Sequence, residues 1–411
     1  MKQHKTNKRK ILNDPVYGFI SLRHDIIHDL IDHPWFQRLR RISQLGLSHL
    51  VYPGAVHNRF HHALGAMHLM HHAIDEIRLK GHEITDEEAL GVTIAILLHD
   101  IGHGPYSHAL EHSLVNGVTH EDISTIIMNQ LNDEFDGQLD LAIEIFNDHY
   151  PKRFLHQLVS SQLDMDRLDY LRRDSFYSGV TEGQVASERI IKMLNVSDDK
   201  LVVEEKGIYS IEKFIVARRL MYWQVYLHKT VISAEFMLVK ILQRAKDLAI
   251  KGWDLHCSEA LHTFLYNDFG KEDFNGKSEV LEQFAQLDDY DIMGAIKVWV
   301  GSKDRVLSIL CKRLVSRDLF KIEISKTPFS HEKKHEILQH ISESLNLSSE
   351  ETSYFLINEM INNKAYSSAA DSIMIRYKDG TLKDAASASD HLNLHALSQT
   401  VEKFFLCYPK L

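Results

Sequence analysis

The segment from Asp86 to His99 is apolar on almost every side of a helical wheel. A surface helix keeps one polar face, so a helix of this kind must lie in the centre of a folded domain. At its end the chain reads Leu97-Leu98-His99-Asp100, and Ile101-Gly102-His103-Gly104-Pro105 follows at once. The pattern predicts a buried central helix that carries a histidine and an aspartate at its last turn.

The composition agrees with a protein that builds a large core. Of the 411 residues, 44% are hydrophobic, and no uncharged run approaches the roughly 18 residues that span a bilayer. The N-terminal MKQHKTNKRK lacks the apolar stretch of a signal peptide, so we expect a soluble cytoplasmic protein with no membrane partner. The net charge of −10 argues against a nucleic acid partner. Three widely separated cysteines, Cys257, Cys311 and Cys407, are expected to be free thiols.

Helical periodicity dominates the first 250 residues. Pro34 marks a helix start, and we expect further helices over 59–80, 86–99, 120–131, 141–150, 154–177, 187–194 and 211–248. The alternating segment 200–210 predicts a small β-hairpin around Lys206-Gly207. Beyond residue 251, segments 318–325 and 372–382 are typical of strands, with a turn over 377–380. We therefore expect a mainly α fold, with a helical core over 1–250 and a mixed α/β C-terminal region over 251–411 packed on it.

The chain has 27 histidines, and histidine is the commonest metal ligand, so their placement matters. On the helix predicted over 59–80, His62 shares the apolar face with Ala66 and Leu69 and points into the protein. A single histidine on an apolar face is more often a hydrogen-bonded core residue than a ligand. His62 becomes a candidate metal ligand only in combination with the other motifs.

His99 and Asp100 carry a desolvation cost at the end of a buried helix unless something pairs with them. A divalent cation does so, because it takes an imidazole nitrogen and a carboxylate oxygen together. The alternative is that Asp100 is a buried cap that accepts hydrogen bonds from the amides of residues 102–104. The glycine-rich turn that follows also presents His103 and His108 beside the site.

Two later segments carry charge in an ordered pattern. On a helix, Asp166, Tyr170 and Arg173 form one line and Asp174 flanks it, an arrangement suited to metal, anion and ribose contacts. Further along, cations and aromatic residues lie on adjoining rows and match a polyphosphate with a base stacked nearby. In both segments the alternative is a solvated helix face with extended cations. The second set comprises Arg218, Tyr222, Tyr226 and Lys229.

Together these motifs resemble the HD-domain phosphohydrolase superfamily. The order His62, His99-Asp100 and Asp166 matches its H…HD…D pattern. Blocks such as Asn13-Asp14-Pro15-Val16-Tyr17-Gly18 and His57-Asn58-Arg59-Phe60-His61-His62 look like the dNTP triphosphohydrolase branch, which includes dGTPase-like enzymes. The resemblance covers about residues 10 to 240 and implies an HD-domain helical core.

The resemblance implies roles for individual residues. One divalent ion (Mn, Fe, Zn, Ni or Mg) would be held by His62, His99, Asp100 and Asp166. The triphosphate would contact Arg59, Arg167, Arg218 and Lys229, with Arg167 in place of the lysine of close relatives. Gln44, Tyr170 and Asp174 would face the deoxyribose, Leu45 would exclude a 2′-hydroxyl, and Tyr226 would approach the base. His103, His108 and His120 would line the reaction centre, with Glu111 orienting His120. Tyr222 and Trp223 depart from the family pattern, so the base preference stays open.

Three functions are compatible with these residues. The first is metal-dependent hydrolysis of a dNTP to deoxynucleoside and tripolyphosphate, with His120 as the acid. The second is hydrolysis of another phosphate ester, such as a nucleoside monophosphate or a cyclic nucleotide. The third is nucleotide sensing without turnover, which would be marked by a lost ligand, and none is lost.

The resemblance also implies regulation and assembly. In nucleotide-activated relatives a guanine nucleotide binds between subunits through residues that match Lys10, Asn13, Asp32, Gln37 and Arg40. The alternative is that Gln37 and Arg40 simply pair on a surface helix. Relatives form oligomers, so we expect a homo-oligomer, either a dimer or a tetramer.

Overall fold

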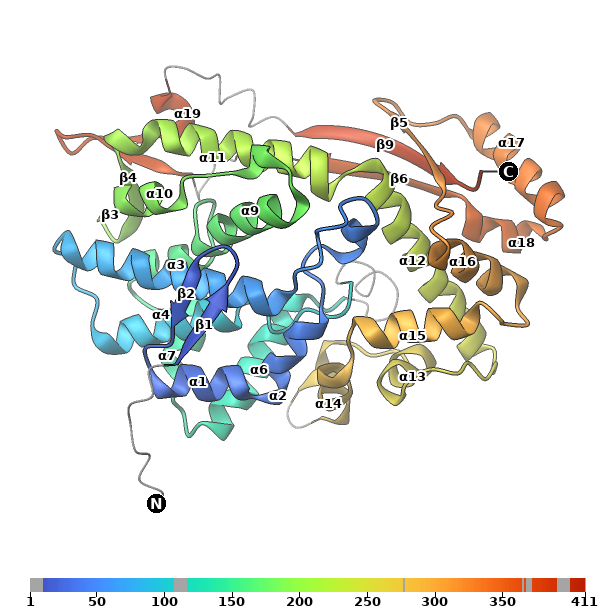
Figure 1. The fold of residues 1–411 in the computed structure, drawn as a ribbon, viewed down its shortest axis with the longest axis horizontal. Helices are drawn as coiled ribbons and strands as arrows, with labels where there is room; N and C mark the ends of the chain where they lie inside the picture. Colours follow the sequence, from blue (N-terminus) through green and yellow to red (C-terminus); the bar gives the residue numbers. More distant parts are fainter. Residues whose placement is uncertain are drawn as a thin grey trace.

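The computed structural model describes residues 10–106, 117–275, 278–363, 366, 372–389 and 400–410. It confirms a mainly α fold with a small hairpin in the helical core and an α/β region toward the C-terminus (Figure 1). At the centre, α3 (Arg59–Leu79) packs against α4 (Asp86–Leu98) on one side and α9 (Met165–Ser178) on the other. These three helices carry the candidate site.

The central helix is buried as predicted. Val92 and every residue from Ile94 to Leu98 have no exposed surface. The helix starts at a capping box, in which the Thr85 hydroxyl accepts from the Glu88 amide and the Glu88 carboxylate accepts from the Thr85 amide. The cap sets the start of α4 and burial holds the helix in the core, and together they fix the position of His99 at its end.

The segment before α3 wraps the core with short elements. Pro34 begins a helix as predicted, but this helix continues only as a 3-10 turn. In that turn, the buried Arg38 guanidinium donates to the carbonyls of Ile101 and His103, which ties it to the loop after α4. The elements are β1 (Ile11–Asp14), β2 (Gly18–Ser21), α1 (Asp25–Asp32), α2 (Pro34–Gln37), η1 (Arg38–Arg41) and η2 (Gly46–Leu50).

The helix predicted over 154–177 is wrong as a single element. It is divided into α8 (Arg153–Val159) and α9, because the Asp164 carboxylate accepts hydrogen bonds from the amides of Ser161 and Arg167. Such local side-chain bonds compete with helix continuation. The other predicted helices of this stretch form, namely α6 (His120–Glu134), α7 (Asp140–Phe146) and α10 (Ser187–Met193).

Two further predictions need correction. The hairpin consists of β3 (Leu194–Ser197) and β4 (Lys200–Glu204) and turns at Asp198 and Asp199, which both have positive φ, whereas residues 206–207 lie in η4 (Glu205–Gly207). The helix predicted over 211–248 is interrupted. It consists of α11 (Ile208–Met221), the π-turn η5 (Tyr222–Tyr226) and α12 (Lys229–Ile250), whose first turn is capped by the His228 ring.

The C-terminal region mixes helices with two sheets. An antiparallel sheet is formed by β5 (Lys321–Ser325), β9 (Val401–Tyr408) and β6 (Ile357–Asn363) (Figure 1). Strand β7 (Met374–Arg376) joins the hairpin of the helical core by pairing in parallel with β4. The predicted strand over 372–382 is the short hairpin of β7 and β8 (Leu382–Asp384). A domain boundary near residue 250 stays a prediction. Among the described residues, no helix is both long and apolar enough to cross a bilayer.

The remaining bounds are η3 (Thr181–Gly183), α13 (Glu259–Tyr266), η6 (Lys271–Phe274), α14 (Glu279–Gln286), α15 (Asp289–Trp299), α16 (Arg305–Val315), α17 (His331–Leu345), α18 (Ser349–Thr352), η7 (Ser353–Phe355) and α19 (Ala385–Ala388).

Candidate functional site

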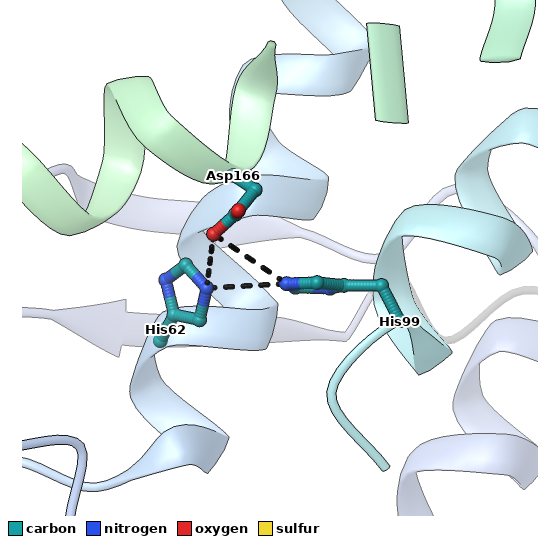
Figure 2. A group of neighbouring side chains, drawn as sticks. All are labelled: His62, His99 and Asp166. Atoms are coloured by element: carbon teal, nitrogen blue, oxygen red, sulfur yellow. Dashed lines mark hydrogen bonds and ion pairs between the residues drawn. The ribbon is translucent and has the colours of Figure 1, made fainter. Parts of the chain in front are cut away.

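Three side chains able to bind a metal ion meet where α3, α4 and α9 approach one another (Figure 2). His62 lies in the first turn of α3, His99 follows the last residue of α4, and Asp166 lies in the first turn of α9. The Nε2 atom of His62 is 3.3 Å from Nε2 of His99 and 3.0 Å from Oδ1 of Asp166. The Nε2 atom of His99 is 3.6 Å from the same Oδ1. The two imidazoles and the carboxylate therefore point into one small volume.

Both histidines have their other ring nitrogen engaged. Nδ1 of His99 lies 2.6 Å from the carbonyl oxygen of Ile96, which can only accept, so Nδ1 carries the proton. Nδ1 of His62 lies 2.7 Å from Oδ2 of Asp169. Partners of this kind fix the tautomer and leave the Nε2 lone pair available to a metal. The donor chemistry therefore fits a divalent ion.

The charge at this point favours a cation. Burial disfavours the charged form of His62, but its hydrogen bonds to Asp166 and Asp169 outweigh burial and raise its pKa to about 10. Burial likewise raises the pKa of Asp166, and the hydrogen bonds from His62 and His99 reverse this and hold that pKa well below its usual value. Carboxylates that stabilise a proton on the buried His62 ring this strongly also suit a divalent cation in place of that proton.

Asp100 borders the cluster and shares its carboxylate with two other residues. Its Oδ1 lies 3.4 Å from Nε2 of His99 and 3.2 Å from Nε2 of His103. Its Oδ2 accepts a 2.6 Å hydrogen bond from Arg59 and lies 3.7 Å from Nε2 of His62. The four residues expected to hold the metal are thus together, three in a tight group and Asp100 at its edge.

The cluster opens into a cavity of about 890 Å³. A second cavity of about 270 Å³ shares Gln44, Arg59 and Tyr222 with the first, so the two adjoin. The larger one is lined by residues that include Gln44, Arg59, His99, Asp100, His103, His120, Asp166, Arg167, Tyr170 and Tyr222. The smaller one adds Leu45, Tyr106, Tyr226 and Glu235. Joined cavities of this kind suit an elongated ligand with a charged and an aromatic-contacting end.

The residues expected to bind substrate are of two kinds, those that line one of the cavities and those that line neither. Gln44, Arg59, Arg167 and Tyr170 line the larger cavity, and Leu45 and Tyr226 line the smaller one. Three others stand outside both linings: the exposed Lys229 at the start of α12, Arg218 and Asp174. The Asp174 carboxylate is buried and is shared between Nε2 of His57 and the Tyr226 hydroxyl, each at 2.8 Å. Asp174 therefore acts on the cavity through Tyr226.

Of the histidines expected at the reaction centre, His103 and His120 are among the described residues. The rings of His103 and His120 stack with their centroids 3.8 Å apart, and both line the larger cavity. Nε2 of His120 lies 3.2 Å from Oε1 of Glu121. Burial and the neighbouring Arg59 charge lower the pKa of His103 to about 3. His108 and Glu111 lie outside the described residues, so the orienting role expected of Glu111 stays a prediction.

The residues expected to bind an activator lie on the first elements of the chain. Lys10 Nζ is 3.9 Å from Oδ2 of Asp32, and Nε of Arg40 donates to Oε1 of Gln37 at 2.7 Å. Asn13 is paired with Phe19 in the β1–β2 hairpin. Gln37 and Arg40 thus form the pair that the alternative interpretation expected, and their role as a nucleotide site stays a prediction.

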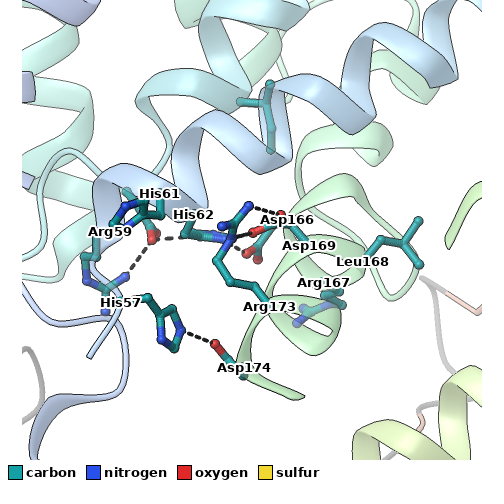
Figure 3. A network of polar contacts seen from close by, with 12 residues as sticks. His57, Arg59, His61, His62, Asp166, Arg167, Leu168, Asp169, Arg173 and Asp174 are labelled. Carbon is teal, nitrogen blue, oxygen red and sulfur yellow. Dashed lines mark hydrogen bonds and ion pairs between the residues drawn. The ribbon is translucent and has the colours of Figure 1, made fainter. Parts of the chain in front are cut away.

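Sequence reasoning missed the carboxylate behind His62. Asp169 lies three residues after Asp166, and Arg173 lies four residues after Asp169 (Figure 3). The i, i+4 spacing of Asp169 and Arg173 is a legible signal for an ion pair on one helix. The pattern also resembles an ordinary solvated stripe, so only the fold shows that this pair is buried against α3.

Comparisons with known proteins identify relatives of this chain. A crystal structure of a phosphohydrolase from Bacteroides thetaiotaomicron is 56% identical, covers 98% of this chain and 100% of its own, and superimposes with a TM-score of 0.95. The uncharacterized protein YwfO of Bacillus subtilis is 36% identical over 77% of this chain and 72% of its own length. The SAMHD1 homolog of Dictyostelium discoideum, a deoxynucleoside triphosphate triphosphohydrolase, is 36% identical over 57% of this chain.

This chain spans about half of that SAMHD1 relative, with 49% of its length matched. The family of the HD associated region matches residues 185–255, the stretch from just before α10 to just after α12. Near-complete agreement with a phosphohydrolase structure, together with the expected H…HD…D residues at one point, establishes the family. The chain belongs to the HD-domain phosphohydrolase superfamily.

Proposed function

We propose that this HD-domain phosphohydrolase is a dGTPase-like enzyme that hydrolyses deoxynucleoside triphosphates to deoxynucleoside and tripolyphosphate. The observation that carries the proposal is that the His62, His99 and Asp166 cluster borders a cavity whose wall includes His99 and Asp166 together with Arg59 and Arg167. A metal site beside fixed guanidinium groups is the arrangement that a polyphosphate requires. The similarity to SAMHD1 relatives supports the same substrate class.

One divalent ion would be held by His62, His99 and Asp166, with Asp100 beside them. When bound, such an ion supplies Lewis acidity, which polarises a phosphoryl oxygen and makes a water molecule more acidic. Two imidazole donors favour Mn²⁺, Fe²⁺, Zn²⁺ or Ni²⁺ over Mg²⁺, which prefers an all-oxygen shell.

The reaction forms one bond and breaks one. The oxygen of a water molecule bonds to the α-phosphorus, and the bond between that phosphorus and the 5′-oxygen of the sugar breaks. The leaving 5′-oxygen takes a proton, for which His120 is our candidate donor. His103, with its pKa near 3, stays neutral and supports His120 by stacking rather than by competing as an acid.

The cationic side chains would bind the triphosphate. Nε of Arg167 donates to the carbonyl of Ser161 at 2.6 Å, which holds its guanidinium at a fixed angle in the cavity wall. Arg59 is fixed in the same way by Asp100. Charge that grows on the phosphoryl oxygens would meet donors already in place. Arg218 and Lys229, which lie outside both cavity linings, are assigned to the outer phosphates from the family resemblance alone.

The smaller cavity and the adjoining part of the larger one would take the nucleoside. Gln44 and Tyr170 are assigned to the deoxyribose, Leu45 excludes a 2′-hydroxyl, and Tyr226 contacts the base. Asp174 positions Tyr226 through their 2.8 Å hydrogen bond.

We further propose a homo-oligomer, dimer or tetramer, activated by a guanine nucleotide at Lys10, Asn13, Asp32, Gln37 and Arg40. Light scattering with and without GTP or dGTP tests this. A change in mass together with faster turnover supports it, and an unchanged mass and rate contradicts it.

A panel of the four dNTPs with Mn²⁺, Fe²⁺ or Mg²⁺ tests the main proposal. Tripolyphosphate and deoxynucleoside are the expected products, in equal amounts. Orthophosphate release from a nucleoside monophosphate or cyclic nucleotide, without tripolyphosphate from any dNTP, would instead identify a phosphatase of another ester.

A further inference from the structure

We propose that Arg173 and Asp14 are positioning residues that set the metal affinity of His62 from outside the cavity. The inference rests on the metal site of the proposed function and extends it to the N-terminal hairpin. Asp169, Arg173 and Asp14 form a continuous buried series of hydrogen bonds that begins at the His62 ring. Figure 3 shows His62, Asp169 and Arg173 of this series. We call this series the His62 relay.

The contacts of the relay are short and complete. Oδ2 of Asp169 lies 2.7 Å from Nδ1 of His62 and accepts from Nε of Arg173 at 2.9 Å. Oδ1 of Asp169 accepts from Nη2 of Arg173 at 3.0 Å, so the carboxylate is held in a two-pronged grip. Nη1 of Arg173 donates to Oδ2 of Asp14 at 2.7 Å. Asp14 in turn accepts from the amides of Val16 and Tyr17 at 3.0 and 2.9 Å.

The relay lies where no solvent screens it. Asp169 and Arg173 have no exposed surface, and Asp14 is only 6% exposed. None of the three appears in the lining of either cavity of the candidate site. The series therefore lies outside both cavities and contacts the metal cluster at the His62 ring.

The relay packs tightly against α3 at Gly65. A Cβ atom added at Gly65 on α3 would come within 2.0 Å of Oδ1 of Asp169 and 2.2 Å of Nη2 of Arg173. Real side chains never approach this closely, so α3 and α9 meet here only because residue 65 is glycine. The carboxylate of Asp169 and the guanidinium of Arg173 therefore pack directly against α3 at Gly65.

Negative and positive charges alternate along the relay, and this alternation is the reason that Asp14 can influence the His62 ring. Arg173 draws charge from Asp169, which makes Asp169 a weaker acceptor for the Nδ1 proton of His62. Asp14 takes up part of the Arg173 charge and restores the basicity of Asp169. A stronger acceptor at Nδ1 makes Nε2 a better metal ligand. Removing the Asp14 charge should therefore weaken metal binding without changing any residue that would hold the metal.

The chain supplies a matched control pair. Arg244 and Asp304 also form a buried two-pronged pair, at 3.1 and 2.6 Å, and Asp304 also accepts a backbone amide, that of Leu307. This pair lies between α12 and α16, and neither residue lines either cavity. Substitution there removes the same kind of interaction and leaves the relay intact.

The test measures the Mn²⁺ dissociation constant of the full-length, chelator-stripped protein, from the spectroscopic signal of free Mn²⁺ and without nucleotide. We expect Asp14→Asn to raise the constant about tenfold, within the range for partners behind a metal ligand. Asp304→Asn should leave it unchanged, even where both variants unfold at similarly reduced temperatures. Wild-type affinity in a folded Asp14→Asn variant would overturn the proposal.

A second pair covers the case in which Asp14→Asn does not fold. Arg173→Lys keeps the charge and loses the two-pronged grip, and Arg244→Lys is its control. Weaker Mn²⁺ binding in Arg173→Lys alone supports the relay, and equal binding in both variants overturns it. Because no nucleotide is present, the result is separate from the proposed function. A protein that binds Mn²⁺ normally but forms no tripolyphosphate contradicts the function and leaves the relay standing.

Discussion

The Nε2 atom of His62 and the Oδ1 atom of Asp166 lie 3.0 Å apart, although the first belongs to α3 and the second to the first turn of α9. If this pair binds a metal ion, Asp166→Asn removes the only carboxylate of the tight group. We expect metal content to fall from about one ion per chain to near zero and dNTP turnover to fall more than about 100-fold. Metal analysis of the purified variant checks this, and His335→Ala on the exposed face of α17 is the control. Full metal content in Asp166→Asn would contradict the assignment.

Arg59 connects the metal site to both cavities through its 2.6 Å bond to Asp100. Lysine keeps the charge but cannot present the planar fork. We expect Arg59→Lys to lower kcat about 100-fold, because a positioned donor to the reacting phosphate is lost. Steady-state kinetics with one dNTP checks this. An unchanged kcat in Arg59→Lys, equal to that of the surface variant Arg305→Lys, would show that Arg59 is structural only.

Leu45 lines the smaller cavity beside Gln44 and Tyr226. Truncation to alanine opens space where a 2′-hydroxyl would lie. We expect Leu45→Ala to raise the ratio of ribonucleotide to deoxyribonucleotide turnover about tenfold, the scale on which an apolar pocket discriminates. Competition between GTP and dGTP checks this. The same ratio in the wild type and in Leu45→Ala would place sugar discrimination elsewhere.

Asp289 ties the C-terminal region to the cavity wall, because its carboxylate accepts from the amides of Ser43 and Tyr106 at 2.8 and 3.3 Å. Burial raises its pKa from 3.8 to about 6. The folded protein therefore holds this proton more tightly than the unfolded chain, and the stability it contributes is lost as the pH rises through about 6.

We expect the unfolding free energy of the wild type, measured relative to Asp289→Asn, to fall by about 1 kcal/mol between pH 5 and pH 7.5. Urea denaturation of both proteins across this range checks the sign. A difference that stays constant with pH would mean that Asp289 titrates outside the window.

The sequence predicted the parts of the site whose signals are local. The apolar run of α4 and the glycine-rich turn after it placed His99 and Asp100, and the face shared with Ala66 and Leu69 turned His62 inward. Family resemblance placed Asp166 with them, and the fold brings all four together.

Other features depend on contacts that no local pattern reveals. The break before α9 arises because the Asp164 side chain competes for backbone amides, which an apolar period does not report. The π-turn η5 interrupts a run of residues that looks helical throughout. The partnership of Asp14 with Arg173 joins the first strand to a helix much later in the chain, so it is visible only once the core is folded.

In the proposed reaction, water attacks the α-phosphorus of a dNTP bound in this cavity. Turnover in ¹⁸O-labelled water, with mass analysis of both products, follows the oxygen of that water. We expect one label in a terminal phosphate of tripolyphosphate and none in the 5′-hydroxyl of the deoxynucleoside. Label in orthophosphate, or in a deoxynucleoside monophosphate released with pyrophosphate, would contradict it.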